Sequence, residues 1–172
     1  MPDAQNHEAL NDAQLDELAR DVAAHLEASG QVVTLAESCT GGWIAKLLTD
    51  IAGSSAWFGQ GVVTYSNSAK GRLLGVPEDL LAAHGAVSEE VVRRMASGAL
   101  DAAQADVSVA VSGVAGPGGG TVAKPVGTVW LGWALRSGFV ISRRERFDGD
   151  RDAIRRAAVA AALNGVLGHA RS

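Results

Sequence analysis

The residues best suited to chemistry stand in the stretch Glu37-Ser38-Cys39-Thr40-Gly41-Gly42. Two hydroxyl groups and a thiol lie there between a carboxylate and two glycines. The largely apolar run 32–35 predicts a buried strand before them, and apolar residues at helical spacing predict a helix that starts at Trp43. The polar cluster therefore occupies a strand-to-helix turn, where a side chain is held at the end of a sheet and backbone N–H groups face its surroundings.

Ser38 has two interpretations on these residues alone. A serine before a helix is commonly an N-cap. The Gly-x-Ser-x-Gly pattern of many hydrolases is absent, because Ala36 and Thr40 stand where its glycines would be. The turn nevertheless allows an exposed serine hydroxyl, with the N–H groups of Thr40 to Gly42 forming an oxyanion hole. Both roles of Ser38, helix cap and nucleophile, therefore remain open.

A nucleophilic serine needs a base, and a lysine is the better candidate. The histidines stand in the polar N-terminal stretch, on predicted helices or near the C-terminus, so a Ser-His-Asp triad is not expected. Lys70 follows the polar run 64–69 at a second strand-to-helix junction, which meets the first one if the two strands are neighbours. Removal from water would lower its pKa and let it accept the Ser38 proton, with Tyr65 relaying or orienting. A solvated helix lysine is the alternative.

Two neighbours of Ser38 have their own alternatives. Cys39 is a second possible nucleophile, because a helix N-terminus lowers the pKa of a thiol. A lone cysteine is also commonly a small buried residue. Glu37 can orient Lys70 or a ligand, and the sequence favours neither role.

A glycine-rich loop, 113–120, follows a predicted strand that ends near Ser112. It has neither the Gly-Lys-Ser/Thr ending of a P-loop nor the full Gly-x-Gly-x-x-Gly pattern. Its backbone N–H groups can cradle a phosphate or a carboxylate, or the loop can simply be flexible. Lys124 adds a cation downstream, and Arg151 stands in the first turn of the last predicted helix, where a ligand or carboxylate would explain it.

Composition narrows the class of protein. The 172 residues are 47% hydrophobic, which suits one globular domain, and the net charge of −4 gives no case for nucleic acid or an anionic membrane as partner. Most of the late arginines, at 143–156, are expected to form a solvated face. The single cysteine excludes an internal disulfide, and no metal site is expected because no residues have metal-ligand spacing. No signal peptide or membrane span is predicted, so we expect a cytoplasmic protein.

The predicted elements give an α/β fold. Strands are expected near 32–35, 57–65 and 106–112, with a late antiparallel hairpin over 126–135 and 139–147. Helices between the early strands and at both ends predict a single domain, a three-layer-like mixed β-sheet flanked by helices. Trp130 and Trp133 on the hairpin are either core residues or an aromatic surface for a dimer.

Several segments taken together resemble one family, the C-terminal domain of the competence/damage-inducible CinA proteins, which is similar to stand-alone nicotinamide-nucleotide amidases. The resemblance covers nearly the whole chain from about Leu15. The segments that carry it, in this order, are 36–42, 65–67 with Lys70, 113–120, 124–128 and 149–151. Val122-Ala123 departs from the family, which often has polar or acidic residues there, and an altered loop flexibility is expected.

The resemblance implies hydrolysis of the carboxamide of nicotinamide mononucleotide, without a cofactor, to nicotinic acid mononucleotide and ammonia. It implies Ser38 as nucleophile and Lys70 as base, with Tyr65 beside them. Residues 1–12 are expected to be a flexible tail and 13–172 the amidase domain of a homo-oligomer, preferably a dimer. A non-catalytic module that binds a nucleotide or sugar phosphate is the alternative. The predicted substrate-binding residues are Glu37, Thr40, Gly41, Gly42, Asn67, Ser112, Gly113, Gly116, Gly118, Gly119 and Arg151.

Overall fold

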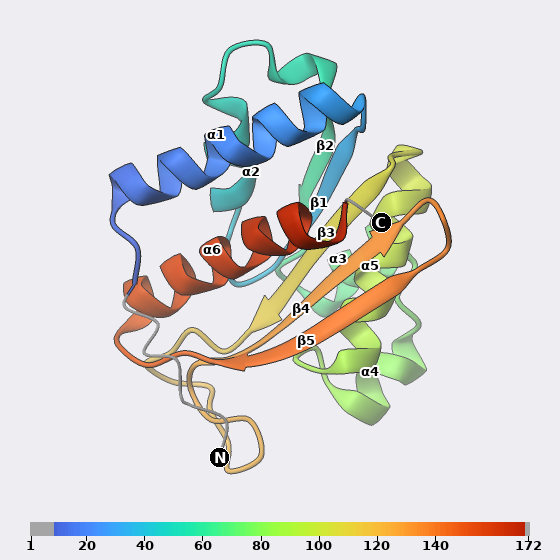
Figure 1. The fold of residues 1–172 in the computed structure, drawn as a ribbon. Helices are drawn as coiled ribbons and strands as arrows, with labels where there is room; N and C mark the ends of the chain where they lie inside the picture. Colours follow the sequence, from blue (N-terminus) through green and yellow to red (C-terminus); the bar gives the residue numbers. More distant parts are fainter. Residues whose placement is uncertain (1–8, 171–172) are drawn as a thin grey trace.

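A five-stranded mixed sheet forms the middle layer of the molecule (Figure 1). The computed structural model describes residues 9–170. The strand order is β2-β1-β3-β4-β5, with β1 parallel to β2 and β3 and with β4 antiparallel to both β3 and β5. The predicted mixed sheet and late hairpin are therefore confirmed. The strands are β1 (Val33–Glu37), β2 (Phe58–Val63), β3 (Val107–Gly113), β4 (Thr128–Leu135) and β5 (Val140–Arg146).

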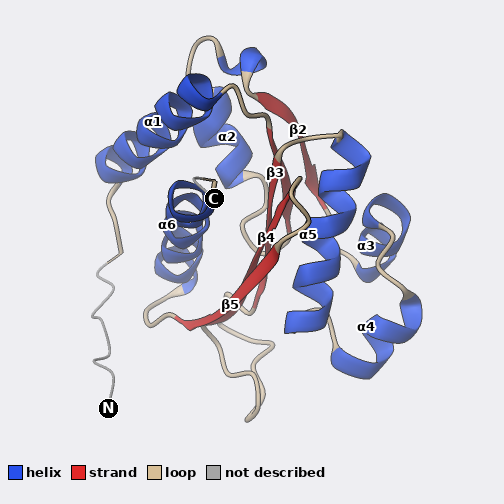
Figure 2. Cartoon of the chain, turned by 45° about the vertical axis from the view of Figure 1, so that its right-hand side comes forward, coloured by secondary structure: helices blue, strands red, loops and turns tan. Residues whose placement is uncertain are grey.

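Helices cover both faces of this sheet, which gives the three predicted layers (Figure 2). One face carries α1 (Asp12–Ser29), α2 (Trp43–Thr49) and α6 (Arg151–His169). The other carries α3 (Asn67–Leu74), α4 (Glu78–His84) and α5 (Glu89–Ala103). A short 3₁₀ turn, Ser54–Ala56, precedes β2. No helix among residues 9–170 has the length and apolar character needed to cross a bilayer.

Local sequence signals set most helix ends. The side chains of Ser66, Ser88 and Asp150 each accept a backbone N–H of the first turn of α3, α5 and α6. Asn11 forms a capping box with Gln14, so α1 begins at Asp12, inside the stretch expected as a tail. The rest of that tail prediction, for residues 1–8, lies outside the described residues.

Two apolar clusters hold the layers together, one on each face of the sheet. Trp133 is 0% exposed in the larger cluster under α6, and its Nε1–H donates to the carbonyl of Ala162 at 3.1 Å. It is a core residue, so an aromatic dimer surface that includes it is wrong. Trp130 points to the other face and is partly buried against the second cluster. Gly132 lets α5 approach this face, because a Cβ there would lie 2.9 Å from the Val92 carbonyl oxygen.

The order in which the strands are connected creates a crevice at the carboxyl ends of the parallel strands. The connection from β1 to β2 runs through α2 on one face, and the connection from β2 to β3 runs through α3, α4 and α5 on the other (Figure 2). Neighbouring strands β1 and β3 thus form a topological switch point, where open α/β sheets place their ligand sites beyond the carboxyl ends of the strands. The three loops that follow β1, β2 and β3 meet there.

Candidate active site

Lys70 and Ser38 lie next to each other at this edge. The Lys70 Nζ is 3.1 Å from the Ser38 Oγ. The same nitrogen lies 2.7 Å from the carbonyl oxygen of Thr64 and 3.4 Å from that of Tyr65, which accept its N–H groups. The parallel pairing of β1 with β2 produces this meeting, because Ser38 follows the first strand and Lys70 the second.

The surroundings of Lys70 favour its neutral form. Its side chain is 1% exposed, and burial lowers the pKa of the amine from its usual 10.5. No carboxylate of residues 9–170 forms an ion pair with it. A neutral amine has N–H groups for the two carbonyls and one lone pair for a hydroxyl proton. The arrangement therefore suits a base acting on Ser38.

The turn after Ser38 supplies backbone donors. Gly41 and Gly42 have φ angles of +61° and +95°, in the left-handed region that favours glycine. The N–H of Gly41 donates to the Ser38 carbonyl at 3.0 Å, so the expected oxyanion role of this amide is wrong. The amides of Cys39, Thr40 and Gly42 donate to no oxygen atom of the described residues, and Cys39 lines the cavity beside Ser38. The amides of Cys39 and Thr40 are the candidate oxyanion donors, because Gly42 lines the groove on the other side of the turn.

Glu37 has a role that the sequence did not reveal. Its carboxylate oxygens accept the backbone N–H groups of Ile44 and Ala45, each at 3.0 Å, and the residue is 1% exposed. Glu37 thus anchors the first turn of α2 and has no hydrogen bond to Lys70. Because this carboxylate already satisfies N–H groups of the helix start, α2 does not offer them to a substrate anion.

Arg155 holds the same turn from the opposite side. Its Nε–H donates to the Cys39 carbonyl at 3.0 Å, and a terminal N–H donates to the Thr40 carbonyl at 3.1 Å. Its guanidinium also lies over the Trp43 ring, 5.3 Å from the centroid. The expectation of a solvated arginine face is wrong for Arg155. Its spacing in the sequence could have indicated a role at the site, because Arg155 stands one helical turn after Arg151 on α6.

A cavity of about 300 Å³ lies beside Ser38 and Lys70. Part of its wall is apolar and comes from Ala86 and Val87 before α5 and from Val114 and Ala115 after β3. Sequence reasoning missed Ala86 and Val87, since small apolar loop residues carry no chemical signal. Its lining residues are Ser38, Cys39, Tyr65, Lys70, Ala86, Val87, Ser112, Gly113, Val114, Ala115, Gly116, Gly118, Gly119 and Arg151.

Ser112 lies at this cavity, but its hydroxyl has a protein partner. The Oγ–H donates to the Ala86 carbonyl at 2.8 Å, and the residue is 1% exposed. The sequence predicted that Ser112 contacts the substrate. Its hydroxyl instead donates a hydrogen bond that fixes the loop carrying Ala86 and Val87.

Arg151 connects two other parts of the cavity rim. One guanidinium nitrogen donates to the Gly116 carbonyl at 2.7 Å, and another donates to the Tyr65 hydroxyl at 3.1 Å. Tyr65 is 61% exposed at the rim. The side chain therefore ties the glycine-rich loop to the loop after β2 and places a cation at the cavity entrance.

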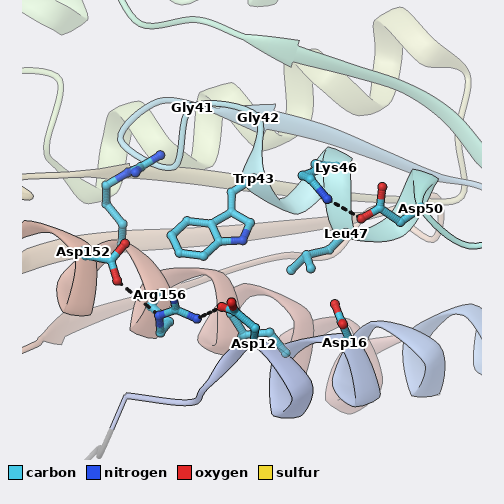
Figure 3. Close-up of a pocket in the computed structure, with 12 residues that line it drawn as sticks. Asp12, Asp16, Gly41, Gly42, Trp43, Lys46, Leu47, Asp50, Asp152 and Arg156 are labelled. Carbon is cyan, nitrogen blue, oxygen red and sulfur yellow. Dashed lines mark hydrogen bonds and ion pairs between the residues drawn. The ribbon is translucent and has the colours of Figure 1, made fainter.

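Several predicted residues lie elsewhere. Asn67 lines a separate cavity of about 590 Å³ between α3 and α4. Gly41 and Gly42 line a groove of about 700 Å³ between α1, α2 and α6 (Figure 3), while Thr40 is fully buried. Lys124 donates to the His84 carbonyl at 2.6 Å. Direct substrate contacts from the Asn67 and Thr40 side chains are therefore not supported by their positions.

The larger groove is not the better candidate for chemistry. It holds no nucleophile with a neighbouring base, whereas the smaller cavity holds both Ser38 and Lys70. Cys39 is the poorer candidate for the nucleophile, because burial raises the pKa of its thiol to about 11, which favours the protonated form at neutral pH. Among residues 9–170, no group of three or more His, Cys, Asp or Glu side chains has the geometry of a metal site.

Known proteins share this fold and sequence. Residues 15–169 match the family described as CinA C-terminal domain. A protein of Escherichia coli K12 named nicotinamide-nucleotide amidohydrolase PncC is 60% identical over 90% of this chain and 93% of its own. The PncC of Pseudomonas putida is 58% identical over 87% and 93%. The crystal structure of competence/damage inducible protein CihA from Agrobacterium tumefaciens is 46% identical, covers 92% and 97%, and superposes with a TM-score of 0.89.

Proposed function

Because this chain belongs to the CinA C-terminal domain family, we propose that it is a nicotinamide-nucleotide amidase. It hydrolyses the carboxamide of nicotinamide mononucleotide to nicotinic acid mononucleotide and ammonia. The name of the E. coli and P. putida relatives supports the substrate. The observation that carries the chemistry is the 3.1 Å contact between the buried Lys70 amine and the Ser38 hydroxyl.

In this mechanism Lys70 is the base and Ser38 the nucleophile. The neutral amine takes the hydroxyl proton while Ser38 Oγ attacks the carboxamide carbon. The oxyanion of the tetrahedral intermediate accepts hydrogen bonds from the free amides of the turn after Ser38. When the C–N bond breaks, the Lys70 ammonium returns the proton to the departing nitrogen, and ammonia leaves. Lys70 then takes a proton from water, which attacks the carbonyl carbon of the acyl-serine ester. The bond to Ser38 Oγ breaks, the Lys70 ammonium returns the proton to this oxygen, and the carboxylic acid product leaves.

The rest of the cavity matches the remaining parts of the nucleotide. The pyridine ring packs against the apolar wall of Ala86, Val87, Val114 and Ala115. Arg151 binds the phosphate at the entrance, because the remaining N–H groups of its guanidinium are unpaired within residues 9–170. Tyr65 orients this arginine through its hydroxyl, and the amides of the glycine-rich loop assist with the phosphate.

Ammonia release from nicotinamide mononucleotide tests this function. The wild-type protein should turn the nucleotide over, and Ser38→Ala should bind it with little change while losing at least about 10³-fold in kcat. Ser137→Ala, in the exposed β4–β5 turn, is the matched control and should be fully active. Tight binding of the nucleotide by the wild type without ammonia release would instead identify a non-catalytic binding module.

We also propose that the enzyme works in the cytoplasm as a homo-oligomer, preferably a dimer. The free thiol of Cys39 suits a reducing compartment. Strand β2 is an edge strand with β1 as its one neighbour in the sheet, and its Val63 is 46% exposed, which suits pairing with a second copy. Light scattering of the purified protein measures the number of copies directly.

A further inference from the structure

We propose that Arg155 is a positioning residue that sets the direction of one oxyanion-hole amide, that of Thr40, from behind the Ser38 turn. This inference rests on the proposed amidase function. The turn has cavities on both of its sides. Ser38 and Cys39 line the cavity that holds Lys70, while Gly41 and Gly42 line the larger groove together with Arg155. Arg155 therefore reaches the turn from the side away from the proposed chemistry.

The contacts of Arg155 fix the orientation of two successive peptide groups. Its guanidinium donates to the carbonyls of Cys39 and Thr40 at 3.0 and 3.1 Å. In a planar trans peptide the C=O and the following N–H point in opposite directions. The N–H of Thr40 is consequently directed away from Arg155. That amide is one of those without an oxygen acceptor in the described chain, whereas the N–H of Gly41 is already bonded to Ser38.

The charge of Arg155 adds to its geometry. A cation at the oxygen end of a peptide group polarises the group and makes its N–H a stronger donor. Oxyanion donors act most effectively when their orientation is fixed before the reaction. Arg155 is itself held by Trp43, because its guanidinium lies over the indole ring, 5.3 Å from the centroid. Trp43 is the first residue of α2, and Glu37 accepts hydrogen bonds from the next two backbone amides of that helix. The side chains of Glu37 and Arg155 thus fix the Ser38 turn by hydrogen bonds, Glu37 at the start of α2 and Arg155 at the Cys39 and Thr40 carbonyls.

Arg155 also packs closely against one glycine of the turn, Gly41. A Cβ at position 41 would lie 3.4 Å from the terminal nitrogen of Arg155, and the φ of +61° disfavours any other residue there. Gly41 and Gly42 therefore act through the left-handed backbone shape of the turn, and Gly41 also through its contact with Arg155. Both line the groove (Figure 3) and not the cavity beside Ser38.

Arg156 provides a matched control. Its guanidinium also lies over Trp43, 5.0 Å from the ring centroid, but its hydrogen bonds go to Asp12, Asp152 and the Leu10 carbonyl rather than to the turn. Both arginines therefore support the packing of α6 on Trp43, and only Arg155 bonds to the carbonyls after Ser38. Replacing each by glutamine separates the effect on packing from the effect on the turn.

The experiment measures kcat and KM for nicotinamide mononucleotide, with melting temperatures as a check on folding. We expect Arg155→Gln to lower kcat about 10- to 100-fold with KM changed less than threefold and with the pH dependence of kcat unaltered. Arg156→Gln should keep kcat within about twofold. Arg155→Lys retains the charge but not the two-nitrogen fork, and should also be slow. Millimolar guanidinium should restore part of kcat to Arg155→Ala, because the groove is open to solvent.

The outcomes separate this inference from the proposed function. If the wild type is active and Arg155→Gln or the folded Arg155→Lys has the kcat of Arg156→Gln, the positioning role is wrong while the amidase stands. A change in KM alone would also overturn it, since that result indicates loss of substrate binding. If the wild type releases no ammonia, the amidase function is wrong and the role of Arg155 falls with it.

Discussion

Ser38 and Lys70 are 32 positions apart in the chain, yet the Ser38 Oγ and the Lys70 Nζ lie 3.1 Å from each other. Parallel pairing of β1 with β2 brings together the turns that carry them. Burial of the lysine then alters its chemistry, because a withdrawn amine loses its proton more readily. The proximity and the burial together are the basis on which we propose Ser38 as nucleophile and Lys70 as base.

The first prediction concerns pH. Lys70 acts as a base only in its neutral form, and its pKa lies below the usual 10.5, so kcat/KM should rise with pH along a limb centred below 10.5. The rate rises with pH because deprotonation of Lys70 produces the active base. The lowered pKa moves this rise to lower pH, since it increases the fraction of neutral amine at any given pH. Steady-state rates in buffers of matched ionic strength measure the limb.

Two variants test whether this limb belongs to Lys70. Lys70→Met removes the lone pair, and Lys70→Arg keeps a permanent positive charge, so both should lose about 10²- to 10⁴-fold in kcat. An active Lys70→Arg would show that position 70 contributes charge rather than a base. Melting curves of both variants establish that they are folded.

Cys39 should be dispensable for turnover. The residue is 6% exposed, and burial raises the pKa of its thiol to about 11, which leaves almost no thiolate at neutral pH. Cys39→Ala retains the backbone amide and should keep kcat within about threefold, because only a small buried group is lost. Iodoacetamide should label the native protein slowly at pH 7.5 and the denatured protein quickly. A loss of kcat comparable with that of Ser38→Ala would contradict the serine mechanism.

Arg151 should determine the preference for a phosphorylated substrate. Charged hydrogen bonds to a phosphate are worth about 1.5–3 kcal/mol, so Arg151→Gln should raise KM for nicotinamide mononucleotide by roughly 10- to 100-fold. Nicotinamide riboside lacks the phosphate, and its kcat/KM should change much less. Arg20→Gln, at an exposed position on α1, is the control. An equal loss on both substrates would assign Arg151 a purely structural role at Gly116 and Tyr65.

Gly98 should be essential for the position of α3, the helix that carries Lys70. A Cβ at residue 98 on α5 would lie 1.9 Å from the backbone oxygen of Leu74, at the end of α3. Gly98→Ala must push the two helices apart and should lower the free energy of unfolding by about 3 kcal/mol. Because the shift displaces the helix of Lys70, kcat should fall as well. Denaturant unfolding and ammonia release measure the two effects.

Gly168→Ala is the control for this substitution. Position 168 lies near the end of α6, and within residues 9–170 no atom apart from its chain neighbours and its own helix backbone is within 4 Å of a Cβ built there. Alanine should therefore leave kcat unchanged and raise the free energy of unfolding by about 0.4–1 kcal/mol, because it restricts the unfolded chain. Equal stability of Gly98→Ala and the wild type would show that α3 and α5 are less closely packed than the structure indicates.

The sequence by itself determined the local features of this protein. Apolar periodicity placed the strands and helices, and Ser66, Ser88 and Asp150, which cap three of the helices, are residue types that favour this position. These features depend on interactions within a few residues, which is why a linear chain reveals them. The pairing of Ser38 with Lys70 was also within reach, because adjacent parallel strands end at the same edge of a sheet.

Only the tertiary structure decided which polar groups remain free. Glu37 bonds to α2 and the Ser112 hydroxyl to Ala86, so neither of these groups is left for a substrate. Arg155 reaches the Ser38 turn from a helix more than a hundred residues away. Hydrogen-bond partners and burial depend on which distant segments pack together, and the same packing sets the pKa values of Lys70 and Cys39. The residue types supplied the candidates, and long-range packing selected among them.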